Sequence, residues 1–390
     1  MLHGTAVAQK SDSPHAREYN RIRRWITIGD AAIGIALLLF LLVSGLSADL
    51  RDFALKLAHR NYVLGLLYYI TMLTLLSKAV GLGLDYYSFR LEHRFELSNQ
   101  KLRSWIRDEL KSYVIGLVIA GILIELLYFT IRVAPRSWWI IAWLGFIALF
   151  IFFAQIAPVV LFPLFYKFEP LDNEELKERL MRLSERAGTR VRGVFEWKLS
   201  EKSKKANAAL AGLGGTRRII ISDTLLANYT PDEIEAVLAH ELGHHVHQHI
   251  FKSIFVQMAI SFFGFWAANA VLRWAVEQRQ MFAYTSDFAN LPLLLLVSTA
   301  LSLLLMPALN AYSRHNEREA DLYCWRSIPS VDPFVSSMNK LCDQNLAERR
   351  PSALVESLFH SHPAIEKRIA AAEDWSSRQT AASSAAPHSE

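Results

Sequence analysis

Cysteine is scarce in this chain: Cys324 and Cys342 are the two among 390 residues. They are too few for a disulfide framework and neither has CxxC spacing, so we expect both to be buried as small hydrophobic side chains. The excess of positive charge is small as well, since the formal net charge is +5. No basic run is interleaved with aromatic residues, and a nucleic-acid partner is therefore not expected.

Charged residues make up only 20% of the chain, whereas hydrophobic residues make up 52%. This balance is typical of a membrane protein. Six apolar stretches are long enough to cross a lipid bilayer, at residues 25–46, 62–84, 112–131, 137–160, 252–273 and 291–310. The first stretch is too long for a signal peptide and no small-residue cleavage site follows it, so we expect it to remain as an anchor.

Arginine and lysine are unevenly shared among the segments that connect the spans. They are frequent in the N-terminal arm at residues 1–24 and in residues 85–111, but few in residues 132–136 and 274–290. Because basic connections stay on the cytoplasmic side, we expect both termini and the polar block at residues 167–250 to face the cytoplasm.

The polar block carries signals for helices and strands. A capping box at residues 172–175 predicts the start of a helix. Residues 191–197 and 218–222 predict two short strands, separated by glycines at positions 212, 214 and 215. We therefore expect a mainly α protein, in which a multi-span helical membrane bundle carries a small cytoplasmic α+β domain.

The clearest motif lies on a helix with a strong start signal. Thr230 is a good N-cap, Pro231 suits the first helical position, and Glu233 can reach back to complete a capping box. Further along the same helix, His240 and His244 are one turn apart. Residues at this spacing share a helix face, so two imidazoles can bind one metal ion.

Glu241 lies about 60° around the same helix from His244, near enough to take a proton from water at the metal. Together these residues form the HExxH arrangement of zinc peptidases, with one zinc ion per chain. A metzincin would need glycine at position 247 and histidine at position 250, but the chain has His247 and Ile250. That class is disfavoured.

Membrane topology narrows the search for a third metal ligand. No acidic residue occurs between His244 and Glu277. Glu277 is expected on the opposite side of the membrane, about 30 Å away across the hydrocarbon core. The first acidic residues on the metal side again lie just after the sixth span, within residues 313–321.

Glu317 and Asp321 are four residues apart and share a helix face, whereas Glu319 points elsewhere. One of the first two can bind zinc, and the other can orient a ligating histidine through a hydrogen bond. The alternative is an ordinary charged helix beside the membrane.

The chain resembles the membrane-embedded CAAX prenyl protease type I family of zinc metallopeptidases over nearly its whole length. The HExxH residues at 240–244 are followed, after two spans, by Glu-Arg-Glu-Ala-Asp at 317–321. Five more segments stand in the order of the family: residues 92–98, 168–171, 206–208, 223–226 and 361–363. Such collinearity is far more specific than HExxH alone.

The resemblance implies roles for individual residues. It makes Glu317 the glutamate ligand and Asp321 the residue that supports a ligating histidine. It further implies that Asn207 holds the substrate backbone and that His362 stabilises the oxyanion. From the sequence alone, Asn207 would be a polar loop residue and His362 a helix N-cap.

We therefore expect an integral-membrane zinc metalloendopeptidase with Glu241 as the general base. Its substrates would be hydrophobic peptides or proteins, either prenylated at a C-terminal CAAX box or derived from the membrane. The chain lacks the further upstream span of eukaryotic members and has Ala209 where they carry an aromatic residue, so it looks more similar to bacterial members. We expect it in a bacterial inner membrane. The alternatives are a quality-control protease of membrane proteins with the same zinc chemistry, and a non-catalytic membrane scaffold.

These expectations divide the chain into six parts. The parts are a cytoplasmic arm (1–24), four spans (25–166), a metallopeptidase part with the HExxH helix (167–250), two spans (251–310), a cytoplasmic part with the third ligand (311–375) and a disordered tail (376–390).

Three details of this plan depend on the fold. The fourth span should kink or re-enter the bilayer near Pro158 and Pro163. Glu125, deep in the third span, should face protein or water. Residues 218–222, if they form an edge strand, could align a substrate by backbone pairing.

Overall fold

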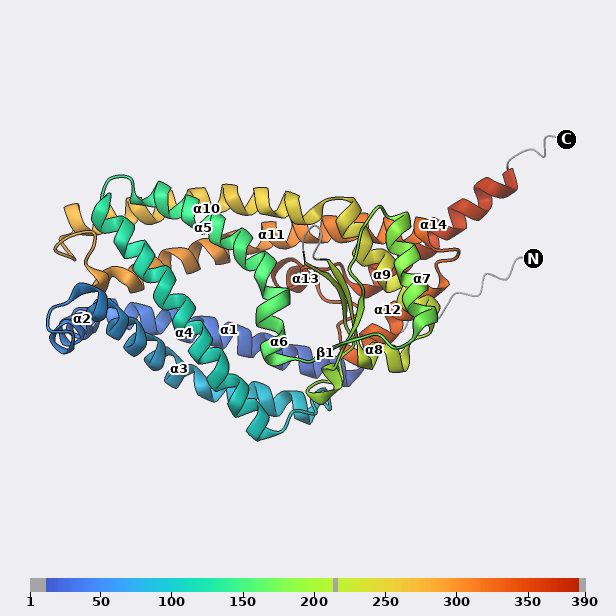
Figure 1. The fold of residues 1–390 in the computed structure, drawn as a ribbon, viewed down its shortest axis with the longest axis horizontal. Helices are drawn as coiled ribbons and strands as arrows, with labels where there is room; N and C mark the ends of the chain where they lie inside the picture. Colours follow the sequence, from blue (N-terminus) through green and yellow to red (C-terminus); the bar gives the residue numbers. More distant parts are fainter. Residues whose placement is uncertain (1–11, 213–216, 386–390) are drawn as a thin grey trace.

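The structure is a computed structural model that describes residues 12–212 and 217–385. Six helices in the described part are long and apolar enough to cross a membrane, which confirms the six predicted spans. They are α1 (Pro14–Val43), α3 (Tyr62–Arg94), α4 (Leu102–Val133), α5 (Trp138–Ile156) with its continuation, α10 (His249–Arg273) and α11 (Leu291–Ser327). Figure 1 shows them along the long axis, with the other elements gathered mainly at one end.

Two of these helices extend well beyond their apolar stretches. Helix α1 already begins at Pro14, because the Ser13 side chain caps it and proline suits its first turn. Residues 14–24 of the predicted arm are therefore helical. Helix α11 continues to Ser327, so the acidic segment after the sixth span is part of the same rigid helix.

The fourth span stays helical past its prolines but changes direction there (Figure 1), in agreement with the predicted kink. Helix α5 is followed directly by a π-helical segment, Ala157–Leu161, and by α6 (Phe162–Phe165). A π turn allows the chain to remain helical past Pro158, which has no N–H to donate to the preceding turn. Within α4, Oε1 of Glu125 is buried without a hydrogen-bond partner in the described part of the chain, so this carboxyl group faces protein.

A four-stranded sheet forms the β part, in the order β1-β2-β4-β3. Its strands are β1 (Phe168–Pro170), β2 (Val194–Trp197), β3 (Ala208–Ala211) and β4 (Arg218–Ser222). Strands β2 and β4 are parallel, and the two outer strands pair antiparallel to them. Strand β4 is thus interior, so the hypothesis that residues 218–222 form an edge is wrong. Its run of buried isoleucines is typical of a strand covered on both faces.

The remaining helices are shorter or lie outside the bundle. They are α2 (Leu46–Leu57), α7 (Glu174–Arg186), α8 (Asp223–Asn228), α9 (Pro231–Val246), α12 (Asp332–Asn345), α13 (Ala353–Phe359) and α14 (Ile365–Ala385). Short 3-10 or π-helical segments occur at Leu199–Glu201, Trp274–Gln278 and Phe288–Asn290.

Two local predictions about these helices are corrected. Asn173 caps α7, but its third position is Leu176, which has no carboxylate to complete the predicted capping box. The predicted disordered tail is wrong for residues 376–385, which continue α14. Arg378 and Asp374, four residues apart, form an ion pair on this segment. Residues 386–390 lie outside the described part.

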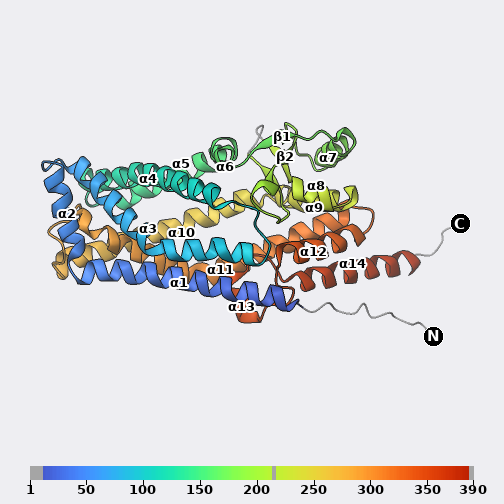
Figure 2. The same ribbon diagram turned by 90° about the horizontal axis from the view of Figure 1, so that it is seen from below.

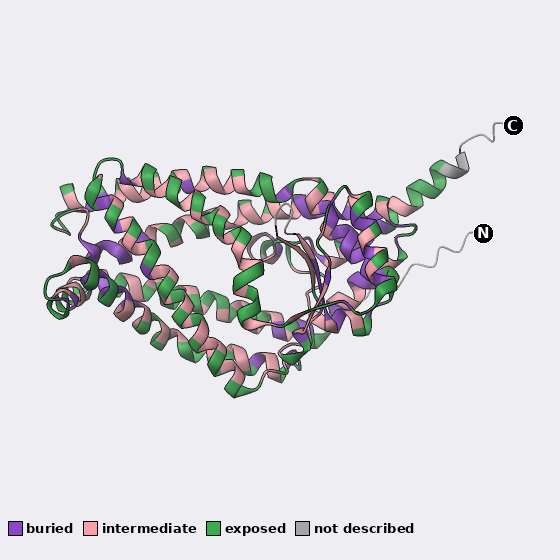
Figure 3. Cartoon of the chain, viewed as in Figure 1, coloured by how far each residue is buried: buried purple, intermediate pink, exposed green. Residues whose placement is uncertain are grey.

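The principal core of the α/β part surrounds α9. It joins the inner faces of β2 and β4 to residues of α7, α9, α11, α12 and α14. Figure 3 shows buried residues concentrated there, whereas the long helices expose much of their surface. The beginning of α1 and the end of α14 both lie at this end, as Figure 2 shows from a second side.

Candidate metal centre

Helix α9 begins as the sequence predicts. The N–H of Glu233 donates to Oγ1 of Thr230 (3.3 Å), and the N–H of Thr230 donates to Oε2 of Glu233 (2.7 Å). Both halves of the capping box are therefore formed, with Pro231 in the first turn. The cap fixes where the helix starts and hence which face carries the histidines.

Helices α9 and α11 cross at a glycine. A Cβ atom added to Gly243 would lie 2.8 Å from Cα and 2.9 Å from the carbonyl oxygen of Ala320. Only glycine allows this approach of the two backbones. Cys324 marks the same interface, since its thiol lies 3.2 Å from the carbonyl oxygen of Ala236. The crossing brings the histidines of α9 against the acidic residues of α11.

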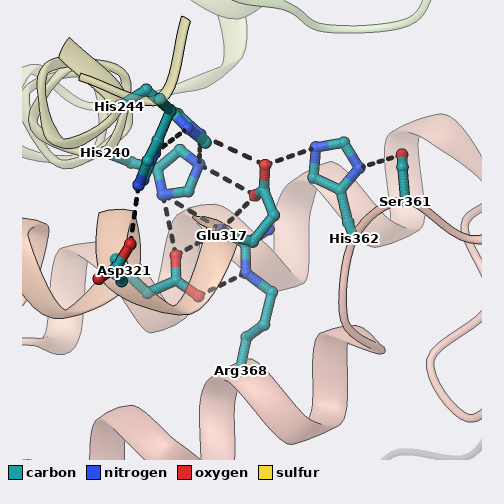
Figure 4. A network of polar contacts seen from close by, with 9 residues as sticks. His240, His244, Glu317, Asp321, Ser361, His362 and Arg368 are labelled. Carbon is teal, nitrogen blue, oxygen red and sulfur yellow. Dashed lines mark hydrogen bonds and ion pairs between the residues drawn. The ribbon is translucent and has the colours of Figure 1, made fainter. Parts of the chain in front are cut away.

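Three side chains converge at this crossing, as Figure 4 shows. Nε2 of His240 lies 3.3 Å from Nε2 of His244. Oε2 of Glu317 lies 3.3 Å from Nε2 of His240, and Oε1 of Glu317 lies 3.3 Å from Nε2 of His244. Ligand atoms about 2.0–2.1 Å from one tetrahedral ion are separated by nearly this distance. The three predicted ligands thus form a group that can hold a metal ion.

Burial supports the same interpretation. His240 is 8% exposed and Glu317 is 4% exposed. Oε2 of Glu317 is buried and has no hydrogen-bond partner in the described part of the chain. An acceptor left without a partner in the interior costs free energy. A cation between the three side chains would satisfy it.

Asp321, the predicted partner of a ligating histidine, lies on the side of the His240 ring that faces away from the three converging ligand groups. Nδ1 of His240 lies 2.9 Å from Oδ1 of Asp321. Burial lowers the pKa of His240, but the neighbouring carboxylates of Asp321 and Glu317 outweigh this and raise the pKa to about 9. A metal ion that binds Nε2 must therefore displace a proton.

Arg368 belongs to this site although the sequence analysis missed it. Its Nη2 and Nε donate to the two oxygens of Asp321 at 2.6 and 2.8 Å. Arg368 is 8% exposed and comes from α14. The only signal in the sequence was a basic residue shortly after the Ser-His-Pro segment at 361–363.

Glu241 faces the same group of residues. Its carboxylate is near enough to His240, His244 and Glu317 to feel their charges. Burial is the largest influence and raises the pKa of Glu241. A carboxylate whose basicity is raised in this way is suited to accept a proton.

His362 also reaches the centre. Its Nε2 lies 3.3 Å from Oε1 of Glu317, while its side chain remains 61% exposed. The loop before it is fixed by Arg314, whose Nη1 donates to the carbonyl oxygens of Glu356 (2.9 Å) and His360 (2.7 Å). His362 is thus presented at the rim of the centre and not in its interior.

Asn207 is the one predicted site residue without a described contact to the cluster. It directly precedes β3, and its side chain is exposed. Its backbone N–H donates to Oγ of Ser222 (3.0 Å). Since β3 is an edge strand packed beside α9, Asn207 stands where an extended peptide could approach the centre.

Comparisons with protein families agree with this geometry. The model of peptidase family M48 matches residues 170–376. A second family model, described as CAAX prenyl protease N-terminal, five membrane helices, matches residues 5–167. Four helices in the described part of that region are long and apolar enough to span, one fewer than the description of the family names.

Individual relatives are similar over most of the chain. An uncharacterized metalloprotease YhfN of Bacillus subtilis is 31% identical over 92% of this chain and 84% of its own length. CAAX prenyl protease 1 of Saccharomyces cerevisiae is 28% identical over 78% of this chain and 71% of its own. The crystal structure of S. mikatae Ste24p superposes with a TM-score of 0.83 at 25% identity, covering 92% and 88% of the two chains.

Proposed function

The chain belongs to peptidase family M48 and is a membrane metallopeptidase, and on that premise we propose that it is a zinc endopeptidase for hydrophobic substrates. His240, His244 and Glu317 are the proposed ligands of one zinc ion. Glu241 is the proposed general base, and Asp321 supports His240. His362 and Asn207 are proposed to contact the substrate.

One observation carries the proposal. Nε2 of His240 and Nε2 of His244 lie 3.3 Å apart, and each lies 3.3 Å from one oxygen of the Glu317 carboxylate. Two imidazoles with one carboxylate are a donor set of catalytic zinc sites. Such sites keep one coordination position open, as three protein ligands would do here. When bound, the ion would act as a Lewis acid that polarises the scissile carbonyl and makes water more acidic.

The side chains around the ligands would perform the proton and charge steps. Glu241 takes the proton of the attacking water and later passes it to the leaving amine. His362, on the rim, donates a hydrogen bond to the oxyanion of the tetrahedral intermediate. Asp321, paired with Arg368, keeps the proton of His240 on Nδ1, so that Nε2 stays free.

Substrate would bind in extended form along β3. This strand is at the edge of the sheet, and an edge strand offers unpaired backbone groups to a peptide. Asn207, just before β3, would bind the substrate backbone through its amide. Because β4 is interior and β3 is at the edge, β3 is the strand proposed to pair with the substrate backbone.

An apolar cavity near this edge supports a hydrophobic substrate. It has a volume of about 180 Å³ and lies between the sheet and the proline-containing end of the fourth span, lined by Pro158, Val159, Pro163, Phe168, Phe195, Ala211, Arg218 and Ile220. Arg218 stacks on Phe195 there, with its guanidinium carbon 5.1 Å from the ring centre. An apolar side chain beside an acidic group would complement this lining.

Two substrate classes are proposed, and the name of one relative supports the first of them. The yeast relative is named for CAAX prenyl proteolysis, which supports C-terminal CAAX-type prenylated substrates. The Bacillus relative has higher identity over more of the chain, and its name gives a metalloprotease without that substrate. Quality-control cleavage of unprenylated membrane proteins by the same zinc chemistry is therefore kept as the second proposed class.

The charge distribution supports the proposed location. The α/β end, the start of α1 and the end of α14 lie at the same end of the molecule (Figure 1). Residues 85–111, which comprise the end of α3, the short connection and the start of α4, are rich in Arg and Lys, and such segments remain cytoplasmic. We therefore assign the centre to the cytoplasmic side of a bacterial inner membrane.

The test compares the purified wild-type protein with Glu241→Ala in detergent. Zinc content is measured together with cleavage of a prenylated CAAX peptide and of an unprenylated membrane protein. We expect stoichiometric zinc in both proteins and cleavage by the wild type alone, because Glu241 is a base and not a ligand. The preferred substrate then decides between the two classes.

A wild-type protein without zinc, or an alanine variant that cleaves equally well, would contradict the enzyme proposal. The protein would then be a non-catalytic membrane scaffold.

A further inference from the structure

His244 is held from behind by two residues that the proposed chemistry does not use. Its Nδ1 lies 2.9 Å from Nδ1 of His249, and Nε2 of His249 lies 3.0 Å from Oε2 of Glu319. The rings of His244 and His249 meet edge to face, with centroids 5.0 Å apart. His249 is only 4% exposed, so both of its ring nitrogens depend on these partners.

The break between α9 and α10 creates this contact. Gln248 adopts a left-handed conformation with φ 56°, and its N–H donates to the carbonyl oxygen of His245 (2.9 Å). The tight turn lets His249, the first residue of α10, pack against the ring of His244 near the end of α9. Glu319 reaches the same place from α11, on a different helix face from Glu317.

Only one arrangement of protons satisfies this chain of neutral imidazoles. A carboxylate can only accept, so Nε2 of His249 carries the proton that it donates to Glu319. Nδ1 of His249 is then an acceptor, and Nδ1 of His244 must donate to it. Nε2 of His244 is left with a free lone pair, and this is the atom that lies 3.3 Å from Glu317.

We propose that His249 and Glu319 are positioning residues that act through His244. They select its tautomer and fix its ring so that Nε2 faces the metal ion. His240 obtains the same support directly from Asp321, whereas His244 obtains it from a carboxylate through one intervening imidazole. Such outer partners of a ligating histidine raise metal affinity. The inference rests on the proposed zinc site and extends it.

Two substitutions at position 249 separate positioning from packing. His249→Leu keeps an apolar side chain but removes the acceptor. His249→Asn restores an acceptor, because its amide oxygen can occupy nearly the position of Nδ1. His247→Leu is the matched control: its ring stacks on that of His249, with centroids 5.6 Å apart and planes at 16°, but no described hydrogen bond joins it to a ligand.

The readouts are the zinc dissociation constant, from competition with a chelator, and the visible spectrum of the cobalt-substituted protein. We expect His249→Leu to weaken zinc binding about 10- to 100-fold and to alter the cobalt spectrum. His249→Asn and His247→Leu should both resemble the wild type. The zinc affinity of Glu319→Ala should lie between those of the wild type and His249→Leu. In this variant His249 keeps its contact with His244 but loses the partner that fixes its proton.

Unchanged zinc affinity and cobalt spectrum in His249→Leu would overturn the inference. So would equal losses in His249→Leu and His249→Asn, since packing alone would explain them. Failure of the zinc proposal is distinguishable, because the wild-type protein itself would then bind no zinc. Thermal unfolding of each variant establishes that the protein compared is folded.

Discussion

The chain buries polar side chains at both ends of its long axis. One group surrounds the crossing of α9 and α11, and the other lies where α2 meets the connection into α11 (Figure 1). We call the second group the distal cluster, and it consists of the buried Ser47, Tyr128, Asp287 and Asn290 together with the partly exposed Arg51.

Every member of the distal cluster is satisfied within the protein. Asp287 pairs with Arg51 through one oxygen and accepts the N–H of Ala289 through the other (3.0 Å). Asn290 accepts from Tyr128 (2.5 Å) and donates to the carbonyl oxygen of Thr285 (2.8 Å). A fully paired network of this kind makes one packing arrangement specific and leaves nothing for a ligand.

The metal centre is built differently. Oε2 of Glu317 has no hydrogen-bond partner in the described part of the chain, and three ligand atoms point at one another. The outer residues Asp321 and Arg368 are fully paired, as in the distal cluster. Burial of charge alone therefore does not identify a site. A site is identified by hydrogen-bond acceptors that lack partners, converge on one point and are surrounded by outer residues that are fully paired.

A substitution at the crossing of α9 and α11 should have the largest effect on the difference between the metal centre and the distal cluster. Gly243→Ala would place a Cβ atom 2.8 Å from the backbone of Ala320 and force α9 and α11 apart. We expect zinc binding and proteolysis to be lost, with destabilisation of about 1–3 kcal/mol from overpacking. Zinc content and thermal unfolding in detergent measure both effects.

The matched control is Gly264→Ala in α10. A Cβ atom there would lie 3.9 Å from a side-chain carbon of Leu301, which is ordinary contact. Alanine is also the better helix former, by about 1 kcal/mol. This variant should keep its zinc and its activity. Zinc binding by Gly243→Ala at wild-type affinity would show that the close crossing is unnecessary.

His362 tests the rim of the metal centre. Its Nε2 lies 3.3 Å from Glu317, but the side chain is 61% exposed and is not among the proposed ligands. We expect His362→Ala to lower kcat on the order of a hundredfold, as removal of one oxyanion donor does, without changing zinc content. Loss of zinc in this variant would instead show that His362 helps to hold the metal ion.

A pair of equivalent substitutions compares the two ends directly. Asp321→Asn removes a charge that supports His240, so zinc affinity should fall about 10- to 100-fold. Asp287→Asn weakens the pair with Arg51, so the protein should lose about 1.5–3 kcal/mol of stability at unchanged zinc affinity. Chelator competition and thermal unfolding are measured on both. If both variants changed zinc affinity and thermal stability to the same extent, the metal centre and the distal cluster would not differ in function.

Much of the metal centre could be predicted from the sequence. The cap at Thr230 and the four-residue spacing of His240 and His244 are local features, and local spacing determines a helix face. Counting acidic residues across the spans left Glu317 and Asp321 as candidates for the third ligand, and the family resemblance implied Glu317. Lipid makes span length a strong constraint, which is why the number of spans was predictable as well.

The remaining parts depend on tertiary contacts. Strand β3 consists of three alanines and one leucine, without polar alternation, so no sequence pattern marks it as an edge. Arg368 stands 47 residues after its partner Asp321, and His249 is one of several clustered histidines. Their roles follow from helix packing and from the turn at Gln248, which no local periodicity encodes.

The smallest expected effect concerns pH, and it separates the two ends without a substitution at either. In the metal-free protein the pKa of His240 is about 9, above its ordinary value of 6.5. Protonated His240 therefore favours the folded state below pH 6.5, and this contribution is lost as the pH rises to about 9. The distal cluster contains no histidine and should not respond in this range.

We expect the thermal stability of the chelator-treated protein to decline across this window and zinc affinity to rise, because zinc needs the neutral imidazole. The control is His240→Asn, and the difference between its profile and that of the wild type isolates this histidine from the others nearby. If the two profiles are parallel, the proton on His240 is not coupled to folding. The metal centre would then be as insensitive to neutral pH as the distal cluster.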